Sequence, residues 1–179
     1  IEEYFEELSD EASAYMRPNL FVNTPDILTA YLQYGGPSAF AIRATLAATL
    51  APTWGVYAGF ELFEHVAVKP GSEEYLDSEK YQLRPRDWDN ALASGHTLAP
   101  YITMLNELRR EHRALQTLRG LTFHNVDNDK IIAYSRRDGD DIAIVICTLD
   151  PYGTQAATVH FDMAALGLDW SDDFRAQDA

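Results

Sequence analysis

Residues 19–58 read NLFVNTPDILTAYLQYGGPSAFAIRATLAATLAPTWGVYA and contain two short apolar runs on either side of a helix-forming segment. The runs, at 19–23 and 53–58, do not alternate apolar with polar residues, which is typical of parallel strands covered on both faces. Between them, Ser38–Leu50 is rich in Ala and Leu, and this predicts a mostly buried helix that ends before Pro52. Strand, helix and strand in this order predict an α/β fold with a parallel sheet.

Helices and loops are predicted on both sides of this unit. Apolar residues recur at helical spacing over 2–15 and over 101–115, so both segments are expected to be helical. We expect a loop between the first apolar run and Gly35. The segment Glu61–Gly95 is polar and irregular, and such a long stretch within a compact domain is usually functional.

After Gly120 the pattern changes to short β-rich runs separated by turn residues such as Asp138-Gly139-Asp140, which indicates β-hairpins. The runs cover residues 121–125, 130–137, 142–149 and 155–161. A boundary near Arg119 is therefore predicted. We expect residues 1–118 to form the last part of an α/β domain and residues 119–179 to begin an antiparallel β domain.

The composition limits the partners. Hydrophobic residues make up 46% of the 179 residues, which is the balance of a chain that buries a core. Fourteen Lys and Arg against 28 Asp and Glu give a net charge of −14, so most of the surface would repel a phosphate backbone. We expect neither nucleic acid nor a membrane as a partner.

A single cysteine, Cys147, excludes an intrachain disulfide and favours a reducing compartment. No run approaches the length of a membrane helix, and the acidic start lacks the features of a signal peptide. We therefore expect a cytoplasmic protein. The first residue is Ile1 and the last residues are polar, so we expect the sequence to be a piece of a longer chain.

Two carboxylates follow the predicted parallel strands. Asp26 comes directly after the first strand and Glu61 after the second, and both would project from the strand ends where barrel active sites are built. Such a pair would suit glycoside chemistry. The alternatives are that Asp26 caps the following segment and that Glu61 pairs with Arg43 or a base in the loop.

The irregular segment mixes charged with aromatic residues, as sugar-binding sites do, although a solvated charged loop would look the same. The residues concerned are Lys80, Tyr81, Arg84, Arg86, Asp87, Trp88 and Asp89. The five histidines show no metal-ligand spacing, so we predict no metal site. His112 lies on the apolar stripe of its helix, where we expect it to have a role in the core. Neither a P-loop nor a nucleophile elbow is present.

Several motifs resemble those of the α-1,4-glucan:maltose-1-phosphate maltosyltransferases of the α-amylase superfamily. They are Arg17–Asp26, Tyr34–Pro37, Pro52–Leu62 and Glu79–Tyr81. In addition, Leu105–His112 looks like the last barrel helix of the superfamily. Ordinary amylases carry Asn-His-Asp where this chain has Thr24-Pro25 before Asp26, and this departure argues against a plain amylase. The resemblance covers nearly the whole chain.

The resemblance implies the last two βα units of a (β/α)8 TIM barrel, followed by part of an antiparallel β-sandwich C-terminal domain. It implies that Asp26 is the catalytic carboxylate that stabilises the transition state, and that Lys80 and Tyr81 bind the donor substrate. The nucleophile and the acid/base residue of the family would lie upstream. We therefore expect the fragment alone to be inactive. No cofactor is implied.

The function implied is that of a hexosyltransferase acting in α-glucan (glycogen) biosynthesis. It would transfer maltosyl units from α-maltose 1-phosphate to the non-reducing end of α-1,4-glucans, with release of phosphate and retention of configuration. A homodimer is also implied for the full-length protein. Two alternatives remain: another enzyme of the superfamily, such as a maltose-trehalose isomerase or an amylase, and a non-catalytic glucan-binding module.

Overall fold

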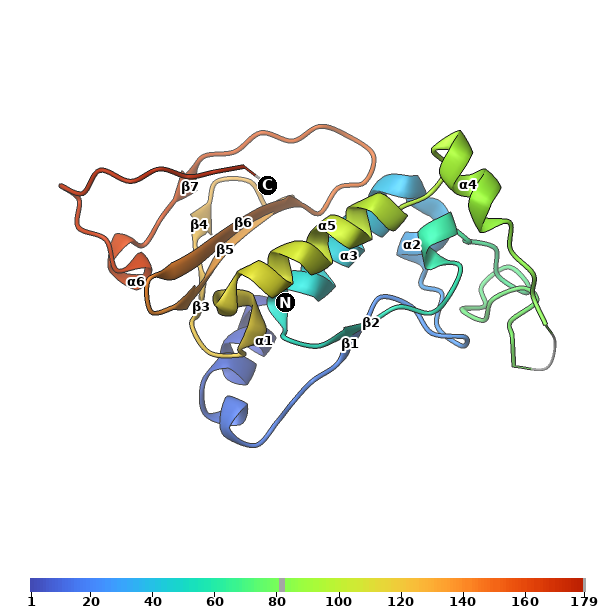
Figure 1. Cartoon of the computed structure of the whole chain (residues 1–179), viewed down its shortest axis with the longest axis horizontal. Helices are drawn as coiled ribbons and strands as arrows, with labels where there is room; N and C mark the ends of the chain where they lie inside the picture. Colours follow the sequence, from blue (N-terminus) through green and yellow to red (C-terminus); the bar gives the residue numbers. More distant parts are fainter. Residues whose placement is uncertain (81–82, 179) are drawn as a thin grey trace.

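The computed structural model describes residues 1–80 and 83–178, and it combines helices with small sheets (Figure 1). The helices are α1 (Glu2–Ser9), α2 (Ala30–Tyr34), α3 (Gly36–Leu50), α4 (Trp88–Ser94), α5 (Ala99–Glu111) and α6 (Met163–Leu166), with the 3₁₀ turns η1 (Glu11–Ala14), η2 (Phe60–Leu62) and η3 (Arg113–Gln116). The strands are β1 (Leu20–Phe21), β2 (Trp54–Gly55), β3 (Leu121–Phe123), β4 (Asn125–Val126), β5 (Ile131–Asp138), β6 (Asp141–Thr148) and β7 (Val159–His160). The antiparallel strands lie at one end of the molecule, and α2, α4 and the long loop lie at the other (Figure 1).

The predicted parallel pair is present but short. β1 pairs with β2 in parallel, with Leu20 opposite Trp54 and Phe21 opposite Gly55. The chain between them contains α2 and α3, so the prediction of two parallel strands joined through a helix is confirmed. A glycine is required at position 55 for a steric reason, because a Cβ there would collide with the ring of Phe21.

Helix α3 is buried on several sides, which explains its high alanine content. Ala39, Ala44 and Ala48 have no exposed surface and belong to a core shared with the loops after β1 and β2. In the same core, the ring of Phe40 packs against that of Phe60, with 4.8 Å between centroids. The neighbouring face contributes Ile42 to a second core under the antiparallel sheet. Small side chains allow both sets of elements to approach the helix closely.

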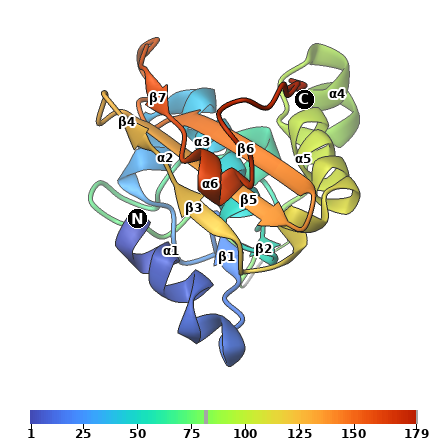
Figure 2. The same ribbon diagram turned by 90° about the vertical axis from the view of Figure 1, so that its left-hand side faces the viewer.

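The strands β3, β5 and β6 form an antiparallel sheet in that order, which lies across α3 (Figure 2). The β5–β6 hairpin closes at Asp138 opposite Asp141, with Gly139 at φ 65°, as the turn residues predicted. On its inner face, Tyr134 has no exposed surface and its hydroxyl shares a 2.5 Å hydrogen bond with that of Thr49 in α3. The sheet and α3 therefore share one core.

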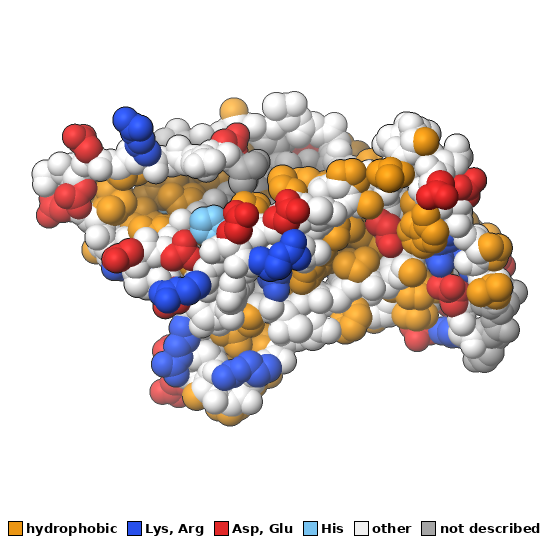
Figure 3. All heavy atoms as spheres, in the orientation of Figure 1, with side chains coloured by type: hydrophobic (Ala, Val, Ile, Leu, Met, Phe, Trp, Pro, Cys, Tyr) orange, Lys and Arg blue, Asp and Glu red, His pale blue; other side chains and the backbone are white. Residues whose placement is uncertain are grey.

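Apolar side chains on the outer face of this sheet are exposed to solvent. Ile144 and Ile146 of β6 are 37% and 55% exposed, and Figure 3 shows hydrophobic side chains in the hollow beside the C-terminal segment. Cys147 points the other way and is buried, and this burial raises the pKa of its thiol to about 11. The thiol is therefore neutral near pH 7.

Some predicted boundaries are wrong. The helix expected over 2–15 is interrupted at Asp10, whose backbone leaves the helical region, and the segment expected as a loop before Gly35 contains α2. The long irregular segment contains α4. The last predicted strand is reduced to the two residues of β7, which pairs with β4 instead of joining the main sheet. Short elements such as these depend on tertiary contacts more than on local pattern.

None of the helices within residues 1–80 and 83–178 has the length and the apolar character that crossing a membrane requires.

Candidate functional site

A tight turn follows β1 and presents Asp26. The backbone amides and carbonyls of Thr24 and Ile27 exchange hydrogen bonds of 3.1 and 3.2 Å, which leaves Pro25 and Asp26 at the two central positions of the turn. Proline suits the first of these positions because its fixed φ matches the turn. The side chain of Asp26 projects from the tip of the turn and is 64% exposed.

Asp26 forms an ion pair with Lys80, which comes from the long loop after β2. Lys80 also donates to Glu74 Oε1 at 2.9 Å, and these two carboxylates hold the pKa of the ammonium above its ordinary value. The structure thus brings together two of the residues singled out from the sequence. The third, Tyr81, lies outside the described residues.

The capping alternative for Asp26 is wrong. Helix α2 begins at Ala30, its N-cap residue is Thr29, and the side chain of Thr29 makes no capping hydrogen bond. The carboxylate of Asp26 is directed to Lys80 instead. Its position in the turn therefore serves the ion pair rather than the start of a helix.

A buried asparagine joins the ends of the two parallel strands. Asn23 is 2% exposed, and its side chain accepts from the amide of Tyr57 at 2.8 Å and donates to the carbonyl of the same residue at 3.3 Å. It also donates to the hydroxyl of Tyr75 at 2.8 Å. Burial raises the pKa of Tyr75 to about 12, so this hydroxyl stays protonated near neutral pH. Asn23 thereby fixes the turn of Asp26 against the loop after β2.

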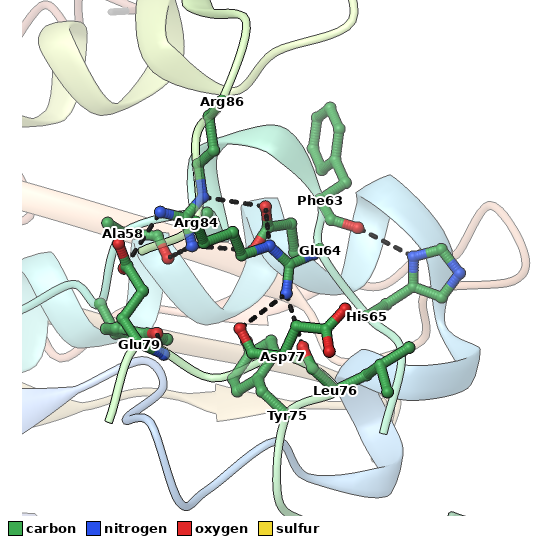
Figure 4. A network of polar contacts seen from close by, with 12 residues as sticks. Ala58, Phe63, Glu64, His65, Tyr75, Leu76, Asp77, Glu79, Arg84 and Arg86 are labelled. Atoms are coloured by element: carbon green, nitrogen blue, oxygen red, sulfur yellow. Dashed lines mark hydrogen bonds and ion pairs between the residues drawn. The ribbon is translucent and has the colours of Figure 1, made fainter. Parts of the chain in front are cut away.

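The long loop is fastened by arginine–carboxylate pairs (Figure 4). Arg86 binds both oxygens of Glu64, at 2.9 and 3.1 Å, and also donates to Glu79 at 3.0 Å and to the carbonyl of Ala58 at 3.1 Å. Burial opposes the charge of Arg86, but the two carboxylates hold its pKa above the ordinary value. Arg84 lies on the other side of Glu64, with Nε 3.3 Å from Oε1.

Glu61, the second carboxylate after a strand, has a local role. Its Oε2 accepts from the amide of Gly59 at 3.0 Å, and its carbonyl accepts from the amide of Leu98 at 2.7 Å at the start of α5. Across the described part of the chain, no ion pair joins Glu61 to Arg43. Glu61 therefore stabilises the turn after β2 and anchors α5.

The remaining charged and aromatic loop residues lie at the start of α4. Asp87 is the N-cap of this helix and accepts from the amide of Asn90 at 3.1 Å. Trp88 is 44% exposed, with the guanidinium carbon of Arg86 6.0 Å from its ring centroid. Asp89 falls in the first turn of α4, where a negative charge complements the helix dipole.

The prediction of a core role for His112 is wrong. The helix α5 ends at Glu111, and the side chain of His112 is 38% exposed with Nδ1 2.8 Å from Asp141 Oδ1. Asp141 also accepts from the amide of Ala114 at 2.9 Å, so the pair ties the end of α5 to β6. Among residues 1–80 and 83–178 there is no group of three or more His, Cys, Asp and Glu side chains that could hold a metal ion.

The sequence alone did not predict a role for Asn23, Glu64 or Glu74. Asn23 could have been singled out because it is a polar residue at the end of an apolar strand, and a buried amide needs hydrogen-bond partners. Glu64 and Glu74 carried no such signal, since their partners Arg86 and Lys80 are distant in sequence and only the folded loop brings them together.

Comparison with known proteins shows that this chain is similar to a family of maltosyltransferases. Residues 123–179 match the family described as GLGE, C-terminal. The chain is 61% identical over 176 residues to α-1,4-glucan:maltose-1-phosphate maltosyltransferase 2 of Streptomyces coelicolor. The matched region covers 98% of this chain and 26% of the relative. The resemblance to the maltosyltransferases is thereby confirmed over nearly the whole chain.

Maltosyltransferases from two other organisms show similar identity. The enzyme of Corynebacterium glutamicum is 60% identical over 166 residues, and that of Mycobacterium tuberculosis is 58% identical over 170 residues. These matches cover 91% and 94% of this chain. In each comparison the chain spans about a quarter of the relative's length.

Proposed function

We propose that this chain is part of an enzyme that transfers maltosyl units from α-maltose 1-phosphate to the non-reducing end of α-1,4-glucans, with release of phosphate. The names of the similar proteins support this reaction. The structural observation that carries the proposal is the ion pair between Asp26 and Lys80, formed after the parallel strands by two residues that the resemblance assigns to catalysis and donor binding.

We further propose that residues 1–118 supply the last two βα units of a (β/α)8 barrel and that residues 119–179 begin an antiparallel β-sandwich domain. The parallel pairing of β1 with β2 and the antiparallel sheet β3–β5–β6 support this division. In barrels of this kind the active site lies at the carboxyl ends of the strands. Asp26 follows the carboxyl end of β1, and Lys80 comes from the loop after β2.

The proposed chemistry is a double displacement with retention. The acid/base residue protonates the phosphate oxygen as its bond to the anomeric carbon breaks, the electron pair of that bond leaves with the phosphate, and an enzyme carboxylate bonds to the anomeric carbon. The 4-hydroxyl of the glucan acceptor then displaces that carboxylate and loses its proton to the acid/base residue. In this chain, Asp26 would stabilise the positive charge that develops on the sugar, and Lys80 would bind the donor.

The ion pair gives Asp26 and Lys80 complementary tasks. Lys80 carries its charge on a flexible side chain that ends in three N–H groups, and this suits binding to an anionic donor substrate. Asp26 presents a carboxylate beside it that can face a developing cation. The nucleophile and the acid/base residue would come from the part of the enzyme before this chain. We also propose the cytoplasm as its compartment, which the sequence favours, and a homodimer as its assembly, which the resemblance implies.

The test is an assay of the full-length enzyme with α-maltose 1-phosphate and a short maltooligosaccharide. We expect stoichiometric release of phosphate and lengthening of the acceptor by two glucose units per turnover. Formation of trehalose would favour the isomerase, and release of reducing sugar from glucan without donor would favour an amylase. Binding of glucan without any turnover would favour the binding module. Each of these three results would contradict the proposal.

A further inference from the structure

Arg86 is more deeply buried and more fully hydrogen-bonded than a solvated surface charge would be. Its side chain is 5% exposed, and its guanidinium reaches three separate parts of the chain: Ala58 after β2, Glu64 after η2, and Glu79 (Figure 4). The two parallel bonds to Glu64 use the fork geometry that only an arginine offers. Arg86 therefore holds these three segments at fixed distances from one another.

Glu79, one of these partners, immediately precedes Lys80. Its carboxylate accepts from Arg86 at 3.0 Å, and its backbone amide donates to the hydroxyl of Tyr57 at 3.0 Å. Tyr57 in turn exchanges two backbone hydrogen bonds with the side chain of Asn23, three residues before Asp26 in the turn after β1. A continuous series of polar contacts thus connects both partners of the Asp26–Lys80 ion pair.

We propose that Arg86 is a positioning residue for the donor site, which fixes the backbone at Glu79 so that Lys80 faces Asp26. This inference rests on the proposed function for its kinetic consequence, but the placement itself does not. Lys80 is long and flexible, so its ammonium can reach many places unless the backbone that carries it is fixed. Asp26 belongs to a turn held by Asn23, whereas Lys80 belongs to a loop that depends on side-chain contacts for its position.

The decisive experiment is a double-mutant cycle in the full-length enzyme, with phosphate release as the assay. We expect Arg86→Lys to raise KM for α-maltose 1-phosphate about tenfold and to leave kcat within about twofold, because it weakens binding in the ground state and the transition state alike. In a Lys80→Ala background, Arg86→Lys should have no further effect on KM. An equal rise in both backgrounds would overturn the proposal.

A matched control separates positioning from general loss of stability. Arg109 is also partly buried and donates to backbone carbonyls of Ala48, Ala51 and Pro52 at the end of α3, away from the loop. We expect Arg109→Lys to lower the melting temperature without changing KM. If Arg109→Lys and Arg86→Lys raise KM by the same factor, Arg86 has no special connection with the donor site.

A crystal structure of the full-length Arg86→Lys variant decides the placement without any assay. We expect Lys80 to have left Asp26 and the segment around Glu79 to have shifted. An unchanged Asp26–Lys80 pair would overturn the inference. A wild-type enzyme that does not use α-maltose 1-phosphate would instead refute the proposed function, and the crystal structure would still test the role of Arg86.

Discussion

The two ends of the molecule are held together by different kinds of bonds. At the antiparallel end, β5 and β6 pair over eight residues each, so regular backbone hydrogen bonds define the structure. At the other end, β1 and β2 pair over two residues, and side chains such as Asn23 and Arg86 bond to the backbone and to carboxylates in place of a ladder. The candidate site lies at this second end, which side-chain bonds hold in place.

The two ends should therefore respond differently to substitution. A backbone ladder survives most side-chain changes, provided that the buried face stays packed. A loop fixed by side chains loses its shape when one buried polar group is removed, because its partners are left without hydrogen bonds. We therefore expect polar substitutions to affect chemistry at the loop end and apolar substitutions to affect stability at the sheet end.

The largest effect is expected from Asp26→Asn in the full-length enzyme. The amide keeps the shape of the side chain but removes the negative charge that would stabilise the transition state. We expect kcat to fall by about a thousandfold, with the fold intact by circular dichroism. A rate close to that of the wild type would remove the catalytic role of Asp26. Glu61→Gln is the matched control, and its effect on kcat should be within about tenfold because Glu61 bonds to Gly59 in its own turn.

The next effect tests the sheet end. Tyr134→Ala removes a fully buried ring and its hydrogen bond to Thr49. We expect the free energy of opening of the β5 and β6 amides, measured by hydrogen exchange, to fall by about 3–5 kcal/mol. Tyr152 is 75% exposed, and Tyr152→Ala should change it by less than about 0.5 kcal/mol. Similar changes in both variants would contradict the packing described for the sheet.

A smaller loss of stability is expected at the loop end. Asn23→Ala leaves the amide of Tyr57 without its partner. It also removes the bond to the hydroxyl of Tyr75 and the bond to the carbonyl of Tyr57, which keeps a second bond from the amide of Phe60. We expect about 1–3 kcal/mol of local stability to be lost around β1 and β2, together with a raised KM for the donor. Asn19 is exposed, and Asn19→Ala serves as the control. A loss confined to the antiparallel sheet would show that Asn23 does not fasten the loop end.

The smallest effect is a pH dependence at the junction of the two ends. Burial acts to raise the pKa of Asp141, but hydrogen bonds from the amide of Ala114 and from His112 outweigh it and hold the pKa below the ordinary value. A carboxyl group with a lowered pKa in the folded state stabilises the protein above its unfolded pKa, and this contribution disappears as the pH falls through the folded pKa.

Urea unfolding of wild type and Asp141→Asn at several pH values measures this contribution. The wild type should be more stable at pH 7, and the difference should shrink as the pH falls below about 4. Asp138→Asn is the control, because Asp138 is 47% exposed and pairs with the exposed Arg113. A difference that stays constant down to low pH would show that the charge of Asp141 does not contribute.

The sequence predicted the sheet end better than the loop end, and the reason is local. The turn at Asp138-Gly139-Asp140 and the apolar runs beside it specify a hairpin from neighbouring residues alone. The order of strands and helix likewise predicted the parallel pair. The two-residue length of β1 and β2 was not predictable, because it depends on Phe21 packing over Gly55 and on Asn23 replacing ladder bonds.

The candidate site shows the same division. Asp26 could be singled out from its place after a strand, whereas its pairing with Lys80 depends on a loop whose shape is set by contacts distant in sequence. Arg86 was one of several charged residues in that loop, and nothing in the sequence distinguished it from Arg84. Its three partners become visible only in the folded chain.

The most direct test of the roles of Asp26 and Lys80 is a crystal structure of the full-length enzyme with a non-reacting analogue of α-maltose 1-phosphate. We predict that the carboxylate of Asp26 lies beside the anomeric centre of the bound sugar and that Lys80 contacts the donor. A donor bound elsewhere, with the Asp26–Lys80 pair undisturbed, would contradict this prediction.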